Sequence, residues 1–313
     1  MWILFIIILI VSIFILLFSY WVGNFFYKLA LNVEKSKAFI AKHHTNTETP
    51  EEKNQKEQNK KWLAEQAKEI AVVSKDGFRL QGYQIQGNLD SHNWVILIHG
   101  YTGNARQMVY AAKEFLAEGF HVLAVDLRGH GKSEGTHIGM GWLDRLDILQ
   151  WIQEIIRQDN KANIVLYGIS MGAAAVMMTI GELLPSNVKV AIEDSGYTSI
   201  WDEFAWELKN IFHLPPTYVL HCARWVAKRK AGYDIKQGSC IRQLQKTKIP
   251  ILMIHGAEDS FVPFSMQEEL YQAVQGKKQK LVVEGAAHVE SYQKQPELYW
   301  NTIKEFIKEN IES

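Results

Sequence analysis

Hydrophobic residues are distributed unevenly along the chain, and the first block of them is continuous. Residues 1–27 (MWILFIIILIVSIFILLFSYWVGNFFY) carry no charged side chain. As a helix this run would extend about 40 Å, enough to cross a hydrocarbon core of about 30 Å with some tilt. Trp2 at one end and Trp21 and Tyr27 near the other suit the two membrane interfaces. The run predicts a retained transmembrane anchor. A cleaved signal peptide is the alternative, but a basic start and a small-residue cleavage site are not evident.

Positive charge follows the apolar run but does not precede it. The N-terminal flank offers only the α-amino group, whereas Lys28, Lys35, Lys37 and Lys42 lie after the run. Cytoplasmic flanks of membrane spans carry an excess of Lys and Arg. We therefore expect a single-pass protein of the cell membrane with the rest of the chain on the cytoplasmic side.

The next segment, residues 28–68, is polar, and its central part lacks a core-facing stripe. Composition of this kind favours a flexible tether, which we place at about residues 43–60, followed by a short helix around Trp62–Lys68. A solvated helix that begins after Pro50 is the alternative.

From about Glu69 to the end, β-rich and helical segments alternate. Two strands around Asp76-Gly77 predict a hairpin, and the later strands are short, apolar runs without alternation. Such strands between helices indicate a mostly parallel sheet covered on both faces, hence an α/β fold over residues 69–313. The rhythm breaks between about residues 197 and 248, where helical patches predict a cap inserted over the carboxyl edge of the sheet. The predicted strands are EIAVVS, FRLQGYQIQG, WVILIHG, HVLAVDLRG, ANIVLYG, VKVAIED, IPILMIHG and KQKLVVEG.

Composition narrows the function classes. The 34 basic side chains balance 34 acidic ones, so net charge gives no reason to expect nucleic-acid binding. Two cysteines, Cys222 and Cys240, are too few for a disulfide scaffold or a thiolate zinc site, and they either pair or stay free. HExxH, Walker and strand-borne GxGxxG motifs do not occur in the sequence, so we expect neither metal nor cofactor.

The strongest chemical signal is Gly168-Ile169-Ser170-Met171-Gly172, directly between a predicted strand and a predicted helix. Two glycines permit a tight elbow that exposes the Ser170 hydroxyl, while the Met171 N–H faces a developing oxyanion at the helix N-terminus. The structural alternative is that Ser170 only caps the N-terminus of the following helix. The elbow predicts a nucleophile.

A serine nucleophile needs a base, and the base needs an acid to orient it. His288 follows the last predicted strand, in a loop of small residues. Asp259 follows the strand before it and is the preferred acid. Glu258 beside it and Asp194 after an earlier strand are competitors, and a turn or cap aspartate is the structural alternative.

These blocks make residues 69–313 resemble the α/β-hydrolase superfamily. The resemblance is carried by LIHGYTGNA, DLRGHGKSEG, YGISMGAA, IHGAEDSFVP and GAAHVES, in the order Ser…Asp…His. With DSGYTS and the anchor, the chain is similar to bacterial membrane-anchored serine hydrolases with esterase- or peptidase-like activities. The resemblance implies an eight-stranded-type sheet, Ser170, Asp259 and His288 as triad, and the Tyr101 N–H as second oxyanion donor with Met171 N–H.

Other residues near the strand ends have structural interpretations. We expect His99, Asp126, Arg128 and His130 to hold turns beside the site. Four cap aromatics form either an acyl pocket or the core face of a helix, with the second slightly favoured. A basic cluster in the cap is either a solvated face or a contact for lipid headgroups or an anionic leaving group. The aromatics are Trp201, Phe204, Trp206 and Phe212, and the cluster is Arg224, Lys228, Arg229 and Lys230.

The predicted function is hydrolysis of a carboxylic ester through an acyl-enzyme (class EC 3.1.1), on a small or apolar acyl substrate. A serine peptidase or thioesterase would use the same triad. A catalytically inactive, membrane-tethered binding protein is the third hypothesis. It is disfavoured because every catalytic position is filled.

Overall fold

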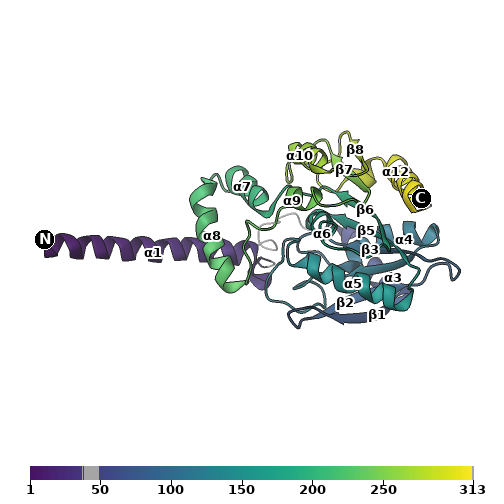
Figure 1. Cartoon of the computed structure of the whole chain (residues 1–313), viewed down its shortest axis with the longest axis horizontal. Coiled ribbons are helices and arrows are strands. Elements are labelled where there is room, and N and C mark those ends of the chain that lie inside the picture. The colour runs from purple at the N-terminus through teal and green to yellow at the C-terminus, as the bar shows by residue number, and fades with distance from the viewer. Residues whose placement is uncertain (37, 39–48, 312–313) are drawn as a thin grey trace.

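The computed structural model describes residues 1–36, 38 and 49–311. Within these residues, the centre of the molecule is an eight-stranded sheet in the order β1-β2-β4-β3-β5-β6-β7-β8 (Figure 1). The strands are β1 (Lys68–Val73), β2 (Arg79–Ile85), β3 (Asn93–Ile98), β4 (His121–Val125), β5 (Asn163–Ile169), β6 (Val188–Asp194), β7 (Ile251–Gly256) and β8 (Lys278–Val283).

Strand pairing follows the predicted pattern of one hairpin and a parallel remainder. β1 and β2 pair antiparallel across a turn in which Gly77 has φ +91°, a value that favours glycine. β2 also pairs antiparallel with β4, and the pairs from β4 through β3, β5, β6 and β7 to β8 are parallel. The mostly parallel α/β-hydrolase sheet predicted from the sequence is confirmed.

Two hydrophobic layers cover the sheet, one on each face. On one face, side chains of the central strands such as Val95 and Leu97 pack with α4 and α12. On the other, Ile96 and Leu123 pack with α5, α6 and α10. Central strands are therefore apolar on both sides, which explains why their sequences do not alternate. The helices of these layers are α4 (Val109–Ala117), α5 (Asp144–Gln158), α6 (Met171–Thr179), α10 (Ser265–Ala273) and α12 (Pro296–Ile311).

Shorter elements and a helical pair complete the domain. The helices α7 (Ile200–Asn210) and α8 (Pro216–Lys230) follow β6 and lie where α1 (Trp2–Ala30) meets the domain (Figure 1). They occupy the stretch in which the sequence predicts an inserted cap. The remaining elements are η1 (Ala105–Met108), α9 (Cys240–Leu244) and α11 (Ser291–Lys294).

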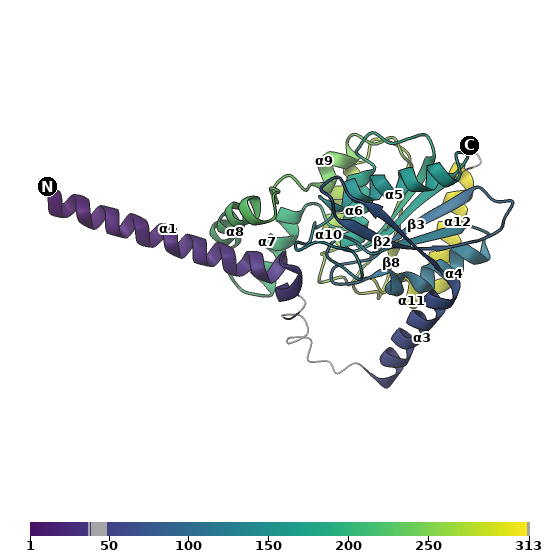
Figure 2. The same cartoon turned by 90° about the horizontal axis from the view of Figure 1, so that it is seen from below.

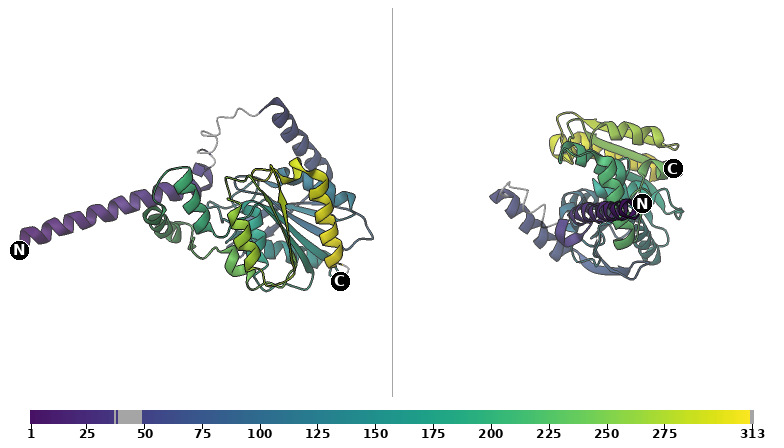
Figure 3. Two further views of the ribbon diagram at one scale, coloured as in Figure 1. Left: turned by 90° about the horizontal axis from the view of Figure 1, so that it is seen from above. Right: turned by 90° about the vertical axis from the view of Figure 1, so that its left-hand side faces the viewer.

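The apolar N-terminal run forms α1, which projects from one end of the molecule (Figure 3). Among the described residues it is the helix that is long and apolar enough to cross a membrane. A signal sequence satisfies the same criterion. The side chains from Trp2 to Phe18 are exposed, whereas Val22 and Tyr27 are buried against the domain.

The prediction of a polar connection from residue 28 onward is wrong for the first residues after α1. Leu31 is buried, the Ile138 N–H donates to the Leu31 carbonyl at 2.9 Å, and Asn32 forms a β-bridge with His137. These contacts place the residues after α1 on the hydrolase domain. Sequence composition missed them because their partners lie about a hundred positions later in the chain.

The second half of the connection also differs from the prediction. The helix α3 (Pro50–Gln66) replaces most of the predicted tether and the short helix around 62–68, while residues 43–48 lie outside the described residues. Pro50 suits a first helical turn, and side-chain pairs such as Lys61–Glu65 (3.8 Å) stabilise the exposed surface of this helix. Only its end is fixed on the domain, where Leu63 is buried in the layer that contains α4 (Figure 2). The alternative of a solvated helix after Pro50 is the one observed.

Candidate active site

Ser170 stands at a strained turn between β5 and α6. Its φ of +53° lies in a region that non-glycine residues avoid, and it leaves the side chain at the carboxyl edge of the sheet. The turn closes only because its flanks lack side chains. A Cβ on Gly168 would overlap the Gly172 carbonyl, and one on Gly172 would overlap the Ile98 carbonyl oxygen. The glycines therefore permit the close strand–helix contact that the sequence motif predicts.

The structure brings the three predicted side chains together. The Ser170 hydroxyl lies 2.9 Å from His288 Nε2, and His288 Nδ1 lies 2.7 Å from Asp259 Oδ2. The nucleophile comes from the loop after β5, the acid from the loop after β7 and the histidine from the loop after β8. Parallel strands end at one edge of a sheet, so three loops distant in sequence converge there. This arrangement can take a proton from Ser170 as it attacks a carbonyl.

Asp259 is held as an ionised acceptor. Its Oδ1 accepts the N–H groups of Phe261 at 3.0 Å and Val262 at 2.9 Å, which leaves Oδ2 for His288. Burial by itself would raise the pKa of Asp259, but hydrogen bonds from His255 and His288 outweigh it and lower the pKa to about 2. Of the competing acids, Glu258 is exposed, and Asp194 accepts hydrogen bonds from Tyr299 at 2.8 Å and Ser195 at 2.9 Å.

The two predicted oxyanion donors belong to residues beside Ser170. Met171 is the first residue of α6, so its N–H is one of the groups without an intrahelical partner. Tyr101 follows Gly100, and a Cβ on Gly100 would lie 3.3 Å from the Ser170 Cβ. The backbone after β3 therefore passes next to the nucleophile. The Tyr101 side chain points elsewhere, because its hydroxyl donates to the Ala30 carbonyl at 2.8 Å.

The residues predicted to hold turns do so. His99 is buried, with Nδ1 at 2.7 Å from the Gly100 carbonyl and Nε2 accepting the Leu127 N–H at 3.0 Å. Arg128 is buried between two carboxylates, Asp147 at 2.6 Å and Asp76 at 2.8 Å. His130 Nδ1 lies 2.9 Å from the Arg128 carbonyl. Asp126 accepts the N–H groups of Lys132 and Ala105, each at 2.8 Å.

The four aromatic residues of the stretch predicted as a cap mainly contact neighbouring elements. Phe204 is buried in the core, and Phe212 packs edge-on against Phe26 of α1 with ring centroids 5.8 Å apart. Trp201 contacts His221, and the Trp206 indole N–H donates to the Ser260 carbonyl at 3.1 Å. The last contact ties α7 to the loop that carries the acid of the triad.

Sequence reasoning missed a second histidine behind the triad. His255 is buried at the end of β7, with Nε2 3.0 Å from the Val262 carbonyl and 3.3 Å from Asp259 Oδ2. Among the described residues, its Nδ1 has no hydrogen-bond partner, and neither has Oε1 of the buried Glu193. Burial raises the pKa of Glu193 to about 8. In the sequence, the signal that could have revealed this pair was a polar residue near the end of each of two apolar strands, Glu193 in β6 and His255 in β7.

We expect the folded protein to lose stability as pH rises through the pKa values of Glu193 and His255. A folded pKa of Glu193 near 8, against an ordinary value of 4.5, means that the folded state holds the proton more tightly. The contribution to the free energy of unfolding is full below about pH 4.5 and is lost by about pH 8, at most about 4–5 kcal/mol. Burial by itself would lower the pKa of His255, but the hydrogen bonds that it donates to Asp259 and to the Val262 carbonyl outweigh burial and raise it, so His255 acts in the same direction.

Thermal melting of wild type and Glu193→Gln between pH 5 and pH 8 measures this contribution. The melting temperature of wild type should fall relative to that of Glu193→Gln as pH rises. Glu258→Gln, an exposed carboxylate replaced in the same way, is the control and should follow wild type. Parallel pH profiles for wild type and Glu193→Gln would contradict the prediction.

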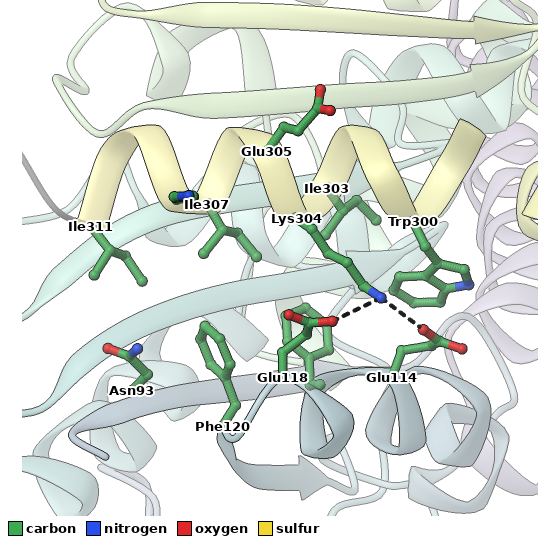
Figure 4. Close-up of a pocket in the computed structure, with 12 residues that line it drawn as sticks. Asn93, Glu114, Glu118, Phe120, Trp300, Ile303, Lys304, Glu305, Ile307 and Ile311 are labelled. Carbon is green, nitrogen blue, oxygen red and sulfur yellow. Dashed lines mark ion pairs between the residues drawn. The ribbon is translucent and has the colours of Figure 1, made fainter. Parts of the chain in front are cut away.

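A groove of about 320 Å³ lies between α4 and α12, away from these residues. Figure 4 shows Lys304 on α12 reaching across it to Glu114 of α4 and to Glu118 just after α4, at 3.4 and 2.9 Å. Its floor is apolar and includes Trp300 and Ile307. Because none of the triad residues lines it, this groove is not the candidate active site.

The part of the chain that the structure describes offers neither a metal-binding cluster nor a disulfide. Within residues 1–36, 38 and 49–311, no group of three or more His, Cys, Asp or Glu side chains is arranged to hold a metal ion. Cys222 and Cys240 are both buried and free.

Comparison with known proteins shows which families and folds this chain resembles. The family described as "Serine aminopeptidase, S33" matches residues 90–237. The esterase Pf2001 of Pyrococcus furiosus superposes with a TM-score of 0.65 at 25% identity, over 80% of this chain and 95% of that chain. The chain has the α/β-hydrolase fold. An acylaminoacyl peptidase of Pyrococcus horikoshii shares the fold with a TM-score of 0.60 at 18% identity, over 78% of this chain and 41% of that one.

Two curated relatives are similar to this chain in sequence. The uncharacterized protein YqkD of Bacillus subtilis is 28% identical over 76% of this chain and 78% of its own length. The lysophosphatidylserine lipase ABHD12 of Danio rerio is 26% identical over 58% of this chain and 47% of its own length. Proteins similar to this chain thus include an esterase and a lipase, and a peptidase shares its fold.

Proposed function

We propose that this chain is a serine hydrolase that cleaves carboxylic esters, with Ser170 as nucleophile, His288 as general base and Asp259 as the acid that orients it. The hydrogen-bonded series Ser170–His288–Asp259, with distances of 2.9 and 2.7 Å at a strained elbow, carries the proposal. The ester is preferred to the amide because the esterase Pf2001 is the more similar of the two solved enzymes.

The reaction proceeds in two acyl-transfer steps. The Ser170 Oγ attacks the ester carbonyl carbon while His288 Nε2 takes its proton, and the N–H groups of Met171 and Tyr101 stabilise the oxyanion. His288 then returns the proton to the leaving alkoxide, which departs as an alcohol. Water activated by His288 hydrolyses the acyl-enzyme and restores Ser170. Asp259 stabilises the imidazolium throughout and is not itself protonated.

We further propose that α1 is a retained membrane span, that the hydrolase domain is cytoplasmic, and that α7 and α8 form a cap over the site. Lysines on the C-terminal side of the apolar run support the orientation. Apolar side chains of α7 beside the acid loop support an apolar acyl group as substrate. A serine peptidase or thioesterase that uses the same triad is the alternative, favoured by the aminopeptidase description of the matching family.

A matched panel of substrates tests the bond that is cleaved. The acyl group is held constant and its p-nitrophenyl ester, thioester and p-nitroanilide are compared, with acyl chains from acetyl to dodecanoyl. We expect kcat/KM for the ester to exceed that for the anilide by at least about tenfold, and to rise with acyl length. Preference for the anilide would support the peptidase, and consistent preference for acetyl esters would contradict the apolar substrate.

A further inference from the structure

The anchor helix and the helix α8 cross in close contact. A Cβ on Gly23 would overlap the Cys222 carbonyl oxygen, so only glycine lets the two backbones approach this closely. Val22 and Val226 are buried around this crossing point. Figure 1 shows α8 running across α1 where α1 meets the domain. If α1 crosses a bilayer, a helix that crosses it at this point runs along the membrane surface.

The contacts on either side of Gly23 show which edge of α8 is turned toward the apolar end of α1. Tyr218 and Trp225 touch earlier residues: the Tyr218 hydroxyl lies 2.8 Å from the Ser19 hydroxyl, and the Trp225 ring packs edge-on against Tyr20 at 5.7 Å. Lys230 touches a later residue, donating to the Asn24 side chain at 2.7 Å. The aromatic edge of α8 therefore lies on the membrane side of the crossing, and Lys230 lies on the domain side.

The exposed stripe of α8 has the composition of a membrane interface. We define the α8 stripe as Tyr218, Trp225, Lys228 and Arg229, which are exposed and recur at helical spacing. Tyr218 is 46% and Trp225 44% exposed, large fractions for aromatic side chains. The Arg229 guanidinium stacks over the Trp225 ring at 4.0 Å, and Lys228 lies at 3.5 Å from Asp234. Aromatic rings with adjacent cations suit the headgroup region of an anionic bilayer.

The length of α1 before the crossing agrees with a position of α8 at the membrane surface. The part of α1 before Ser19 is exposed on all sides and would extend about 25 Å, slightly less than a hydrocarbon core of about 30 Å. The α8 stripe would then lie within the interfacial layer, where amphipathic helices bury their aromatic side chains.

The hydrolase domain is fixed to α1, so this position cannot vary freely. The Tyr101 hydroxyl donates to the Ala30 carbonyl, Tyr27 lies 2.6 Å from His137 Nδ1, and the opposite face of α8 is buried through Val219 and Leu220. Tyr101 and His137 lie in loops that follow β3 and β4. The carboxyl edge of the sheet, which carries Ser170, is thus the edge next to α1.

We propose that the α8 stripe is a membrane-binding surface that contacts anionic lipid headgroups of the bilayer crossed by α1. It holds the hydrolase domain against the membrane with the edge that carries Ser170 turned toward the lipid. The inference rests on the proposed span of α1 and is independent of which bond the enzyme cleaves.

The test uses the full chain in lipid nanodiscs, with an environment-sensitive fluorophore attached at Trp225→Cys and quenched by a nitroxide on the lipid headgroup. Leu183→Cys is the control, because Leu183 is fully exposed and precedes β6, at the opposite edge of the sheet. Background labelling of the two buried native cysteines is measured on the wild-type chain, which lacks an introduced cysteine. We expect quenching at position 225 to exceed that at position 183 by at least about threefold.

The contribution of Lys228 and Arg229 to membrane contact is tested by changing the lipid composition of the nanodiscs. Quenching at position 225 should rise when about 30% phosphatidylglycerol replaces phosphatidylcholine, and fall again in about 0.5 M NaCl. With Lys228→Gln and Arg229→Gln added, the two compositions should give the same quenching. Equal quenching at positions 225 and 183 in a chain that resists alkaline extraction would overturn the surface but leave the span intact. Release of the chain by alkaline extraction would overturn both, and neither result bears on the triad.

Discussion

Replacing Ser170 with alanine is expected to lower kcat/KM for a p-nitrophenyl ester by at least about a thousandfold, equivalent to about 4 kcal/mol of transition-state stabilisation. The variant keeps the elbow, His288 and the backbone N–H groups, so binding and oxyanion stabilisation persist. What it loses is the oxygen that lies 2.9 Å from His288 Nε2 and forms the acyl-enzyme. Residual turnover should therefore show no burst of product.

Labelling with a fluorophosphonate checks the same assignment without a substrate. Wild type should be labelled at Ser170, and Ser170→Ala should not be labelled. Ser186→Ala is the matched control, because Ser186 is exposed in the loop before β6, and it should keep both activity and labelling. If wild type neither turns over an ester nor reacts with the probe, the tethered binding protein becomes the better hypothesis.

Replacing Asp259 with asparagine should lower kcat by about a thousand- to ten-thousandfold. The amide oxygen is expected to stay with the N–H groups of Phe261 and Val262, because only an oxygen can accept them. The amide NH₂ then occupies the position of Oδ2 and faces His288 Nδ1. A donor there forces the His288 proton onto Nε2, so that the imidazole cannot accept a proton from Ser170.

The neighbouring carboxylate provides the control for this variant. Glu258→Gln makes the same chemical change at an exposed position one residue away and should retain activity within about twofold. Steady-state kinetics on the same ester, with melting temperatures to confirm folding, measure both variants. A large loss in Glu258→Gln together with an active Asp259→Asn would reassign the acid to Glu258.

Much of the fold follows from local patterns. The apolar runs at β3, β5 and β7 indicate strands buried on both faces, and the parallel sheet requires this. Ser170, Asp259 and His288 could be selected because each lies in the loop that follows a strand, and strand ends meet at one edge. Local sequence was therefore sufficient to select a residue where a chemically reactive side chain follows a recognisable strand.

The interactions around the triad are harder to predict from sequence. His255 and Glu193 end two strands that lie side by side, but the sequence shows only two polar residues in apolar runs. Their burial, which raises the pKa of Glu193, depends on neighbours supplied by other elements. The helix α3 was the less favoured interpretation of its segment for a different reason, since its polar surface lacks the periodic apolar stripe that identifies a helix.

By itself, the sequence determined an apolar N-terminal helix, a mostly parallel α/β sheet and the residues most suited to acyl transfer. Tertiary structure decided how the helix meets the hydrolase domain. The contact of Ser19 with Tyr218 joins residues 199 positions apart, and that of Gly23 with Cys222 depends on two backbones meeting at one point. Periodicity reports which residues share a face of one element, whereas the partner of that face is set by packing between distant elements. For that reason the orientation of the domain relative to α1 emerges only from the folded molecule.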